Sequence, residues 1–192
     1  LKHGDLPDEQ RQEYVEIIEK ESLRLSEMAT SVLNMSRIEN QTILTDISTF
    51  NLSEQIRSAV LLLEKKWTQK HVELNLDFDE VVITGNQEML SQVWINLLDN
   101  AIKFTTDYGT VRVHIQQEDA MVVVTVENTG STVPEDQKEH IFQKFYQADT
   151  SHATEGNGIG LAVVQKIVAL HHGNVSVRSQ QDITSFQVSL PA

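Results

Sequence analysis

Amide and lysine side chains occupy one line along an otherwise apolar segment, residues 92–105. On a helical wheel, the apolar residues of this segment cover most of the circumference, which predicts a helix that is buried on nearly all sides. The remaining arc carries Gln92, Asn96, Asp99, Asn100 and Lys103, and three of them, Asn96, Asn100 and Lys103, stack along one line. Carboxamide oxygens suit Mg²⁺ and a lysine suits phosphate, so the pattern indicates a metal and phosphate site. Taken alone, the same helix is explained equally well by a polar face in contact with water.

Three alternating glycines, Gly156, Gly158 and Gly160, stand directly before an apolar run with helical spacing, 161–170. Glycines before a helix leave backbone N–H groups exposed at the positive end of the helix dipole, where phosphates bind. The spacing differs from the dinucleotide fingerprint G-x-G-x-x-G, and the chain has no G-x-x-x-x-G-K-[ST] sequence, which excludes a P-loop enzyme. Together with the amide-bearing helix, the glycines indicate a nucleotide site more strongly than either motif alone.

The chain resembles the C-terminal part of two-component sensor histidine kinases. Four boxes occur in the family's order and spacing, followed by its closing strand. The boxes are INLLDNAIKFT (95–105, N box), VENTGSTVP (126–134, first glycine box), IFQKFYQAD (141–149, F box) and GNGIGLAVVQKIVALHHGNVSV (156–177, second glycine box). The closing strand is ITSFQVSLP (183–191). A weaker resemblance extends to the start of the chain.

The resemblance implies that the chain binds ATP and Mg²⁺. It assigns the Mg²⁺ that bridges the ATP phosphates to Asn100, a supporting role at the same metal to Asn96, and a phosphate contact to Lys103. A lid over ATP is expected at 148–157. The hinge and floor of this lid are expected at Gly156, Gly158 and Gly160.

The first glycine box indicates which residues are expected to bind adenine. By resemblance, Asn128 and Gly130 receive the adenine ring, while Val133 and Leu161 line its pocket. Thr184 is expected either to reach a phosphate or to serve only in the sheet.

Several positions depart from the family pattern. The first glycine box usually reads D-x-G-x-G, and its aspartate accepts a hydrogen bond from the adenine amino group. This chain has Asn128 and Thr132 instead. An asparagine still accepts through its amide oxygen, so adenine recognition is expected at reduced strength. Gln147 stands where the F box often has arginine, and Ile183 replaces a glycine. These changes are expected to bear on catalytic rate rather than on fold.

The residue type at position 96 separates two kinds of ATPase within the wider superfamily. Gyrase-type and mismatch-repair ATPases place a glutamate there, which activates water for hydrolysis. The amide of Asn96 cannot act as a general base, so the γ-phosphate is expected to be kept for transfer. Two alternatives stay open: a hydrolysing ATPase, and a degenerate nucleotide-binding module that acts through dimerisation.

The family's phosphoacceptor is a histidine followed directly by Glu or Asp and soon by Pro, on the first helix of a hairpin. None of the seven histidines of this chain has that context. The chain is therefore expected to be a fragment that lacks this helix, so that it binds ATP but does not phosphorylate itself. By resemblance, the phosphate passes from histidine to the aspartate of a cognate response regulator.

A long helix is predicted before the nucleotide-binding part. Ile18, Leu25 and Val32 recur every seven residues, which is typical of a coiled coil or helix bundle. Such a helix needs partner helices to bury its stripe; the alternative is packing on the chain's own globular domain. By resemblance, 1–39 is the second helix of the dimerisation and histidine-phosphotransfer hairpin, which pairs into a homodimer in the full-length protein. Residues 40–51 are predicted as a linker and 52–192 as the catalytic ATP-binding domain.

Helical and strand patterns alternate in the second part of the chain. Helices are predicted at 52–67, from 87 onward, at 138–146 and after Gly160, and Asn51 or Ser53 is a candidate cap. Strands are predicted at 71–78, 81–84, 110–116, 121–127, 174–179 and 185–190. These elements predict an α+β fold with helices on one face of a mixed sheet. Such a two-layer α/β sandwich is the architecture of the histidine-kinase and gyrase-type ATPase superfamily.

The composition excludes several classes of protein. A net charge of −13 argues against nucleic-acid binding and against docking on anionic lipid. The chain has no cysteine, which excludes disulfides and thiolate metal sites. Its apolar runs are too short to cross a bilayer, so this fragment is expected to be soluble. By resemblance, it lies on the cytoplasmic side of the membrane as part of a full-length membrane sensor.

Overall fold

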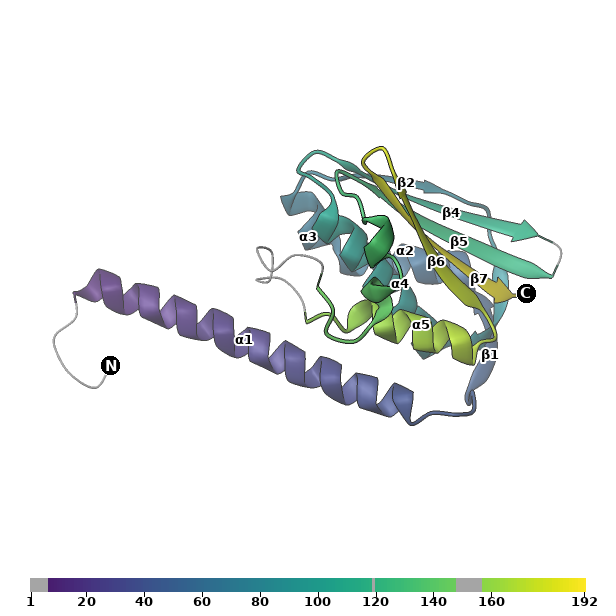
Figure 1. Cartoon of the computed structure of the whole chain (residues 1–192), viewed down its shortest axis with the longest axis horizontal. Coiled ribbons are helices and arrows are strands. Elements are labelled where there is room, and N and C mark those ends of the chain that lie inside the picture. The colour runs from purple at the N-terminus through teal and green to yellow at the C-terminus, as the bar shows by residue number, and fades with distance from the viewer. Residues whose placement is uncertain (1–6, 119, 148–156) are drawn as a thin grey trace.

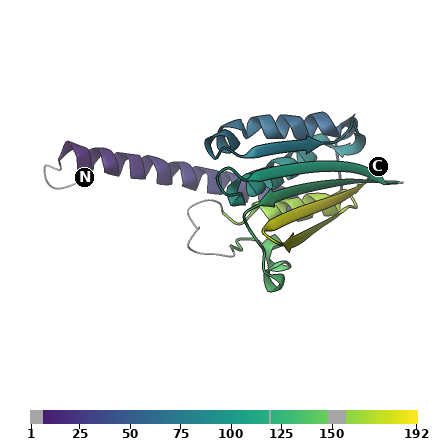
Figure 2. The ribbon, with the colours of Figure 1, turned by 90° about the horizontal axis from the view of Figure 1, so that it is seen from above.

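The computed structural model of the chain describes residues 7–118, 120–147 and 157–192. Helix α1 (Asp8–Glu39) is the long helix that the seven-residue spacing predicts. It extends well beyond the sheet and the other helices in both views (Figures 1 and 2). The spaced residues are exposed on it: Ile18 is 50%, Leu25 66% and Val32 40% exposed. The last turns of α1 contact the rest of the chain, where Met35 is buried.

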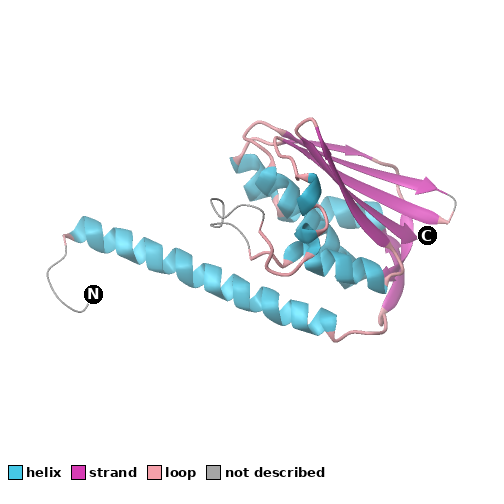
Figure 3. Ribbon diagram, in the orientation of Figure 1, coloured by secondary structure: helices cyan, strands magenta, loops and turns pink. Residues whose placement is uncertain are grey.

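A five-stranded sheet forms one layer of the second part of the chain (Figure 3). Its order is β2 (Glu73–Asp77), β4 (Thr110–Glu118), β5 (Met121–Thr129), β7 (Ile183–Pro191) and β6 (Asn174–Gln180). β2 runs parallel to β4, and the other neighbours are antiparallel. Burial alternates along β7 because successive side chains point to opposite faces of a sheet. The buried face is the one that the helices cover.

Four helices of the described part of the chain make up the second layer. They are α2 (Leu52–Leu62), α3 (Glu64–Gln69), α4 (Gln87–Phe104) and α5 (Gly160–Leu170). The core lies between this layer and the sheet, and its members at 2% exposure or less include Trp94, Leu97, Ala101, Val164, Ile167 and Phe186. The predicted two-layer α/β sandwich is therefore confirmed. Among the described helices, none is both long and apolar enough to cross a membrane.

The last five residues of the predicted linker are a strand, which corrects that prediction. β1 (Ile47–Asn51) pairs antiparallel with β3 (Val82–Asn86) in a separate two-stranded sheet. The polar composition of this segment concealed the strand because its residues are exposed or half-buried. β1 leads directly into α2, whose N-cap is Asn51: its side chain accepts from the N–H of Glu54 at 2.9 Å.

Two helix predictions were wrong in detail. The helix expected over 52–67 bends at Leu63, which is buried, and continues as α3. No α-helix forms over the described residues 138–146; short 3₁₀ helices, η1 (Glu135–Gln137) and η2 (His140–Phe142), precede and begin that segment. The chain becomes extended at Gln143 and left-handed at Phe145, which stops helical hydrogen bonding.

Candidate functional site

Asn96, Asn100 and Lys103 lie along one face of α4, and all three are half-buried. The other faces of the helix are packed into the core through Leu90, Val93, Trp94, Leu97, Leu98, Ala101 and Ile102. The three polar residues therefore stand at the edge of the core rather than on a fully solvated face. This position disfavours the explanation of the pattern as an ordinary polar surface.

The start of α4 is anchored to the end of α5. Asn86 caps α4, since its side chain accepts from the N–H of Met89 at 2.9 Å. The backbone N–H of Asn86 donates to Nε2 of His171 at 3.0 Å, and Nδ1 of His171 bonds the carbonyl of Ile167 at 2.8 Å. Burial lowers the pKa of His171, against the opposing effect of the bond to Ile167. A neutral ring suits this contact, because Nε2 accepts only when it carries no proton.

The end of α4 is held by a lysine from the preceding helix–strand connection. Nζ of Lys70 donates to the carbonyls of Ile102, Lys103 and Thr105 at 3.1, 2.8 and 2.6 Å. These carbonyls have no partners inside the helix, and a positive charge complements the negative end of the dipole. The helix that carries the candidate site residues is thus fixed at both ends.

Asn96 joins α4 to the first residue of α5. Its Nδ2 donates to the carbonyl of Gly160 at 3.2 Å, and its Oδ1 accepts from Nε2 of Gln92 at 3.0 Å. Among the described residues, no side chain caps the start of α5. Its first N–H groups are therefore available to an anion beside α4.

The glycines of the second glycine box differ in what they require. Gly158 has a φ of +67°, and a Cβ there would lie 2.8 Å from the backbone carbonyl carbon of Phe145, so only glycine fits without strain. A Cβ at Gly160 would make an ordinary contact with Asn96 at 3.7 Å. Gly156 and 148–156 of the predicted lid lie outside the described residues.

Asn128 and Thr184 lie opposite each other on β5 and β7, and each is only 2% exposed. Nδ2 of Asn128 donates to Oγ of Ser131 at 2.9 Å and lies 3.5 Å from the carbonyl of Thr129. Oγ1 of Thr184 donates to the carbonyl of Ser131 at 2.9 Å and pairs with Oγ of Ser179 at 2.9 Å. The hydroxyl of Thr184 is thus engaged within the protein beside Asn128.

The other predicted site residues take varied positions. Gly130 has a φ of +88°, in the left-handed region that favours glycine. The N–H of Val133 donates to Oγ of Ser179 at 2.8 Å, and Leu161 packs partly buried against the core. Nζ of Lys103 lies 4.8 Å from the centre of the Phe104 ring.

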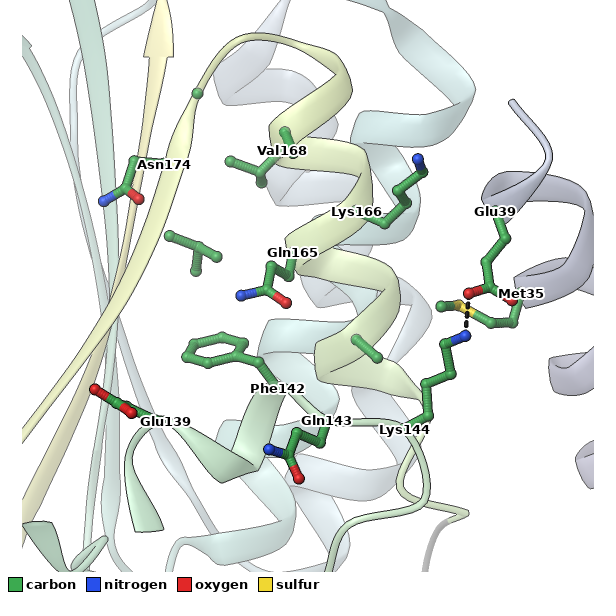
Figure 4. Close-up of a pocket in the computed structure, with 14 residues that line it drawn as sticks. Met35, Glu39, Glu139, Phe142, Gln143, Lys144, Gln165, Lys166, Val168 and Asn174 are labelled. Atoms are coloured by element: carbon green, nitrogen blue, oxygen red, sulfur yellow. Dashed lines mark ion pairs between the residues drawn. The ribbon is translucent and has the colours of Figure 1, made fainter. Parts of the chain in front are cut away.

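Two grooves lie elsewhere on the molecule. One, of about 770 Å³, runs between the end of α1 and α5; Figure 4 shows Met35 and Glu39 of α1 facing Lys144, with an ion pair between Glu39 and Lys144. The other, of about 860 Å³, is lined by polar residues of β1, α2 and the first half of α4. Neither groove includes Asn100, Lys103 or Asn128, so the chemistry of the side chains identifies the site better than these grooves do.

Two features of the site fit a nucleotide. The amide of Asn128, a residue that is 2% exposed, uses its NH₂ group for the contacts with Ser131 and Thr129, and its oxygen can accept a hydrogen bond from a bound donor. No side chain of the described residues caps the start of α5, which suits a phosphate. Within the described part of the chain, no three His, Cys, Asp or Glu side chains are grouped to hold a metal. A metal beside α4 would take amide, phosphate and water oxygens, as Mg²⁺ does with nucleotides.

The sequence did not single out several residues that support the site. Gln92 precedes Asn96 by four residues on the same helix face, and this spacing was a usable signal. Lys70, His171 and Ser179 act through contacts between segments far apart in the chain, for which no local pattern exists. Ser131 lies inside the first glycine box, but its contact with Asn128 depends on how the loop folds.

Comparison with known proteins agrees with this arrangement. Residues 85–192 match the family model described as "Histidine kinase-, DNA gyrase B-, and HSP90-like ATPase". The sensor histidine kinase RppB of Synechocystis sp. is 34% identical over 179 residues, which cover 91% of this chain and 39% of RppB. The chain thus spans well under half the length of this curated relative.

Two solved structures extend the comparison to the whole chain. Full-length ShkA in complex with AMPPNP superposes with a TM-score of 0.82 at 26% identity, covering 98% of this chain and 40% of that one. Histidine kinase ThkA in complex with the response regulator TrrA superposes with a TM-score of 0.80 at 28% identity, covering 99% of this chain and 53% of that one.

The segment matched by the family model begins just before α4 and contains Asn96, Asn100, Asn128 and Gly160, so the family match and the site assembled from the structure coincide. The chain belongs to the histidine kinase-, DNA gyrase B- and HSP90-like ATPases, as the ATP-binding catalytic region of a sensor histidine kinase.

Proposed function

We propose that this chain binds ATP with Mg²⁺ between α4, α5 and the end of β5, and presents the γ-phosphate for transfer to a histidine. The observation that carries the proposal is Asn96. Its amide bridges Gln92 and the carbonyl of Gly160 at the start of α5, at the position where a hydrolase of this superfamily has a glutamate. An amide cannot take a proton from water, so the bound nucleotide is protected from hydrolysis and available for transfer.

The phosphate end is assigned to α4 and to the start of α5. Asn100 contributes its amide oxygen to Mg²⁺, Asn96 supports the same region, and Lys103 neutralises phosphate charge. Bound Mg²⁺ would offset the negative charge that develops on the phosphate oxygens. Gly158 and Gly160 bring the backbone N–H groups of α5 to the phosphates, and Gly156 is assigned to the same hinge. Phosphoryl transfer needs this positioning and charge neutralisation more than covalent help from the protein.

The adenine end is assigned to the first glycine box. Oδ1 of Asn128 accepts from the adenine amino group, Gly130 lets the loop turn beside the ring, and Val133 and Leu161 supply apolar contacts. The pairing of Thr184 with Asn128 supports a role for Thr184 at this end rather than at a phosphate.

The phosphoacceptor histidine is proposed to lie on another helix of the whole protein. Among the described histidines, His71 stacks on Tyr108, His140 bonds Gln143, and His171 is buried in a structural contact. His3 and His152 lie outside the described residues. The chain alone is expected to bind ATP without forming phosphohistidine.

Two partners are proposed. A response regulator is supported by the solved complex of ThkA with TrrA, whose kinase chain is similar to this one. A second copy of the chain, paired through helices in the full-length protein, is supported by the exposed apolar stripe of α1. The whole protein is proposed to be a membrane sensor, with this part on the cytoplasmic side.

Calorimetric titration with ATP, with and without Mg²⁺, tests the proposal first. ATP binding that Mg²⁺ strengthens is expected, and a supplied hairpin that carries the family's phosphoacceptor histidine should then gain an acid-labile phosphate. Release of inorganic phosphate without labelling of the hairpin would favour a hydrolysing ATPase. Absence of nucleotide binding at millimolar ATP would favour the degenerate module that acts through dimerisation. The departures from the family pattern at Asn128, Thr132 and Gln147 would then explain the loss of binding.

A further inference from the structure

The last turn of α4 ends without the left-handed glycine that closes many helices. Its C-cap is Thr105, which is extended at φ −71° and ψ 140°. The N–H and the hydroxyl of Thr105 both donate to the carbonyl of Ala101, at 3.0 and 2.7 Å. A helix that stops in this way leaves its later carbonyls without an N–H from a following turn, so they need a donor from elsewhere in the chain.

Lys70 supplies that donor. Its ammonium group donates to the carbonyls of Ile102, Lys103 and Thr105 at 3.1, 2.8 and 2.6 Å. An ammonium group has three N–H donors, and these three bonds use all of them. Lys70 is half-buried, and its charge complements the negative end of the helix dipole. The side chain is therefore committed to the end of α4 and is not itself available to a phosphate.

The backbone around Lys70 is fastened to the connection between α4 and β4. The carbonyl of Lys70 accepts from the N–H of Tyr108 at 3.0 Å, and the ring of His71 stacks on that of Tyr108 with centroids 4.8 Å apart. The N–H of Glu73 donates to the carbonyl of Gly109 at 2.9 Å, where β2 begins its parallel pairing with β4. Sheet pairing thus fixes the point from which the Lys70 side chain reaches α4.

The turn that Lys70 holds contains Lys103, to which the proposed function assigns a phosphate contact. Lys103 is half-buried and lies one residue before the end of α4. Its ammonium group lies 4.8 Å from the centre of the Phe104 ring, and Phe104 is the last residue of the helix. The last turn of a helix frays readily, and more so when its carbonyls lack partners. Loss of Lys70 should therefore free the backbone that directs the Lys103 side chain.

We propose that Lys70 is a positioning residue for phosphate binding that acts through Lys103. By holding the last turn of α4 in one conformation, it places the Lys103 ammonium group beside the phosphates of ATP. The inference rests on the proposed function, because it requires that the phosphates lie against the face of α4 that carries Lys103.

A double-mutant cycle with Lys70→Met and Lys103→Met tests whether Lys70 acts through Lys103. Calorimetry measures the affinity for ATP with Mg²⁺ in the wild type, the two single variants and the double variant. Lys70→Met should weaken binding roughly threefold to tenfold. In the Lys103→Met background, the same change should alter binding by less than about twofold, because the ammonium group that Lys70 positions is already absent.

The cycle separates positioning from loss of folded protein or loss of charge. Either of these would weaken ATP binding by a similar factor whether or not Lys103 is present. Lys65→Met, at an exposed position of α3, is the matched control for the loss of a positive charge and should leave the affinity within about twofold. Lys70→Arg keeps the charge and the donors and should retain most of the wild-type affinity. If circular dichroism shows that Lys70→Met is unfolded, Lys70→Gln, which keeps a donor, replaces it in the cycle.

Amide hydrogen exchange gives a second measurement that needs no nucleotide. The amides of the last turn of α4, including the N–H of Thr105, should exchange roughly fivefold faster in Lys70→Met than in the wild type. The amides of the first turn of α4, where Asn86 is the cap, should exchange at the wild-type rate. Faster exchange at both ends would indicate global destabilisation rather than release of the last turn.

The possible results distinguish the inference from the proposed function. Equal weakening of ATP binding by Lys70→Met in both backgrounds overturns the inference and leaves the proposed function in place. Unchanged ATP affinity in Lys70→Met, or exchange in the last turn that is unchanged or faster at both ends, does the same. Absence of ATP binding by the wild type overturns both.

Discussion

The proposed base end of the site, around Asn128, is built from neighbouring strands, whereas the proposed phosphate end, around Asn100, is built from two helices. Asn128 and Thr184 are 2% exposed and tied into a network of short-range hydrogen bonds with Ser131 and Ser179. At the phosphate end, Asn96 and Asn100 are half-buried on α4. There the geometry depends on how α4 and α5 are placed relative to each other.

This difference indicates which substitutions should disturb the geometry of each end. Strand pairing places Asn128, Thr184 and Ser179 beside one another, because the register of β5, β7 and β6 sets which residues are neighbours. The phosphate end depends on anchors at a distance, namely the contact of Asn86 with His171 and the lysine cap by Lys70. Changes at one end should therefore leave the other largely intact.

The largest expected effect comes from Asn100→Ala. Loss of the proposed Mg²⁺ ligand should weaken Mg²⁺-dependent ATP binding roughly tenfold to a hundredfold. The ratio of the affinities for ATP and for ITP, whose base carries an oxygen in place of the 6-amino group, reports on the base end and should stay the same. Calorimetry with both nucleotides measures this, and Asn75→Ala, on an exposed position of β2, is the matched control. Equal loss of magnesium dependence and of base selectivity would mean that the two ends are not independent.

Gly130→Ala should damage the base end through strain. The residue has a φ of +88°, and a Cβ there would lie 2.7 Å from Cγ2 and 3.0 Å from the backbone nitrogen of Thr106. A destabilisation of about 1–3 kcal/mol is expected, measured by urea unfolding.

Gly160→Ala is the control variant for the stability measurement. Its Cβ would lie 3.7 Å from Asn96, an ordinary contact distance, and its φ lies outside the left-handed region. It should change unfolding free energy by well under about 1 kcal/mol. A similar loss in both variants would contradict the assignment of strain to Gly130.

The anchor of α4 should make stability depend on pH. The pKa of folded His171 lies below 6.5, so the unfolded chain takes up the proton first as pH falls. The stabilising contribution is complete above about pH 6.5 and is lost as pH falls through the folded-state pKa. His171→Ala should cost about 1–2 kcal/mol at pH 7.5, and the difference from wild type should shrink toward pH 5.

Chemical denaturation across this pH range measures the effect, with His114→Ala as the comparison because His114 is more than a third exposed. A difference between wild type and His171→Ala that is constant with pH would show that the ring accepts no proton-dependent bond from Asn86.

The smallest expected effect is that of Gln92→Ala. Removing the donor to Oδ1 of Asn96 loosens one amide at the phosphate end, which should weaken ATP binding roughly twofold to fivefold. The ATP to ITP ratio should not change. Gln116→Ala, on an exposed position of β4, controls for the loss of a glutamine. A changed ratio would indicate that α4 also positions the base.

The sequence predicted the parts of the molecule that have a short-range pattern. The heptad spacing predicted α1, strand alternation predicted β4 to β7, and the apolar wheel around Asn96 and Asn100 predicted the buried helix α4. Prediction from the sequence was wrong where the local residue types indicate a different secondary structure from the one that forms. β1 is too polar to be recognised alone, and the segment around Phe142 turns because of a left-handed residue at Phe145.

By itself, the sequence determined which side chains could bind a phosphate, a metal and a base, because residue type and helical or strand period are local properties. Only the tertiary structure decided how those side chains are oriented. The bonds of Asn128 to Ser131, of Asn86 to His171 and of Asn96 to Gly160 join segments whose approach depends on sheet register and helix packing. Hydrogen bonds depend on direction as well as on distance, so the partners of these three asparagines could be identified only in the folded chain.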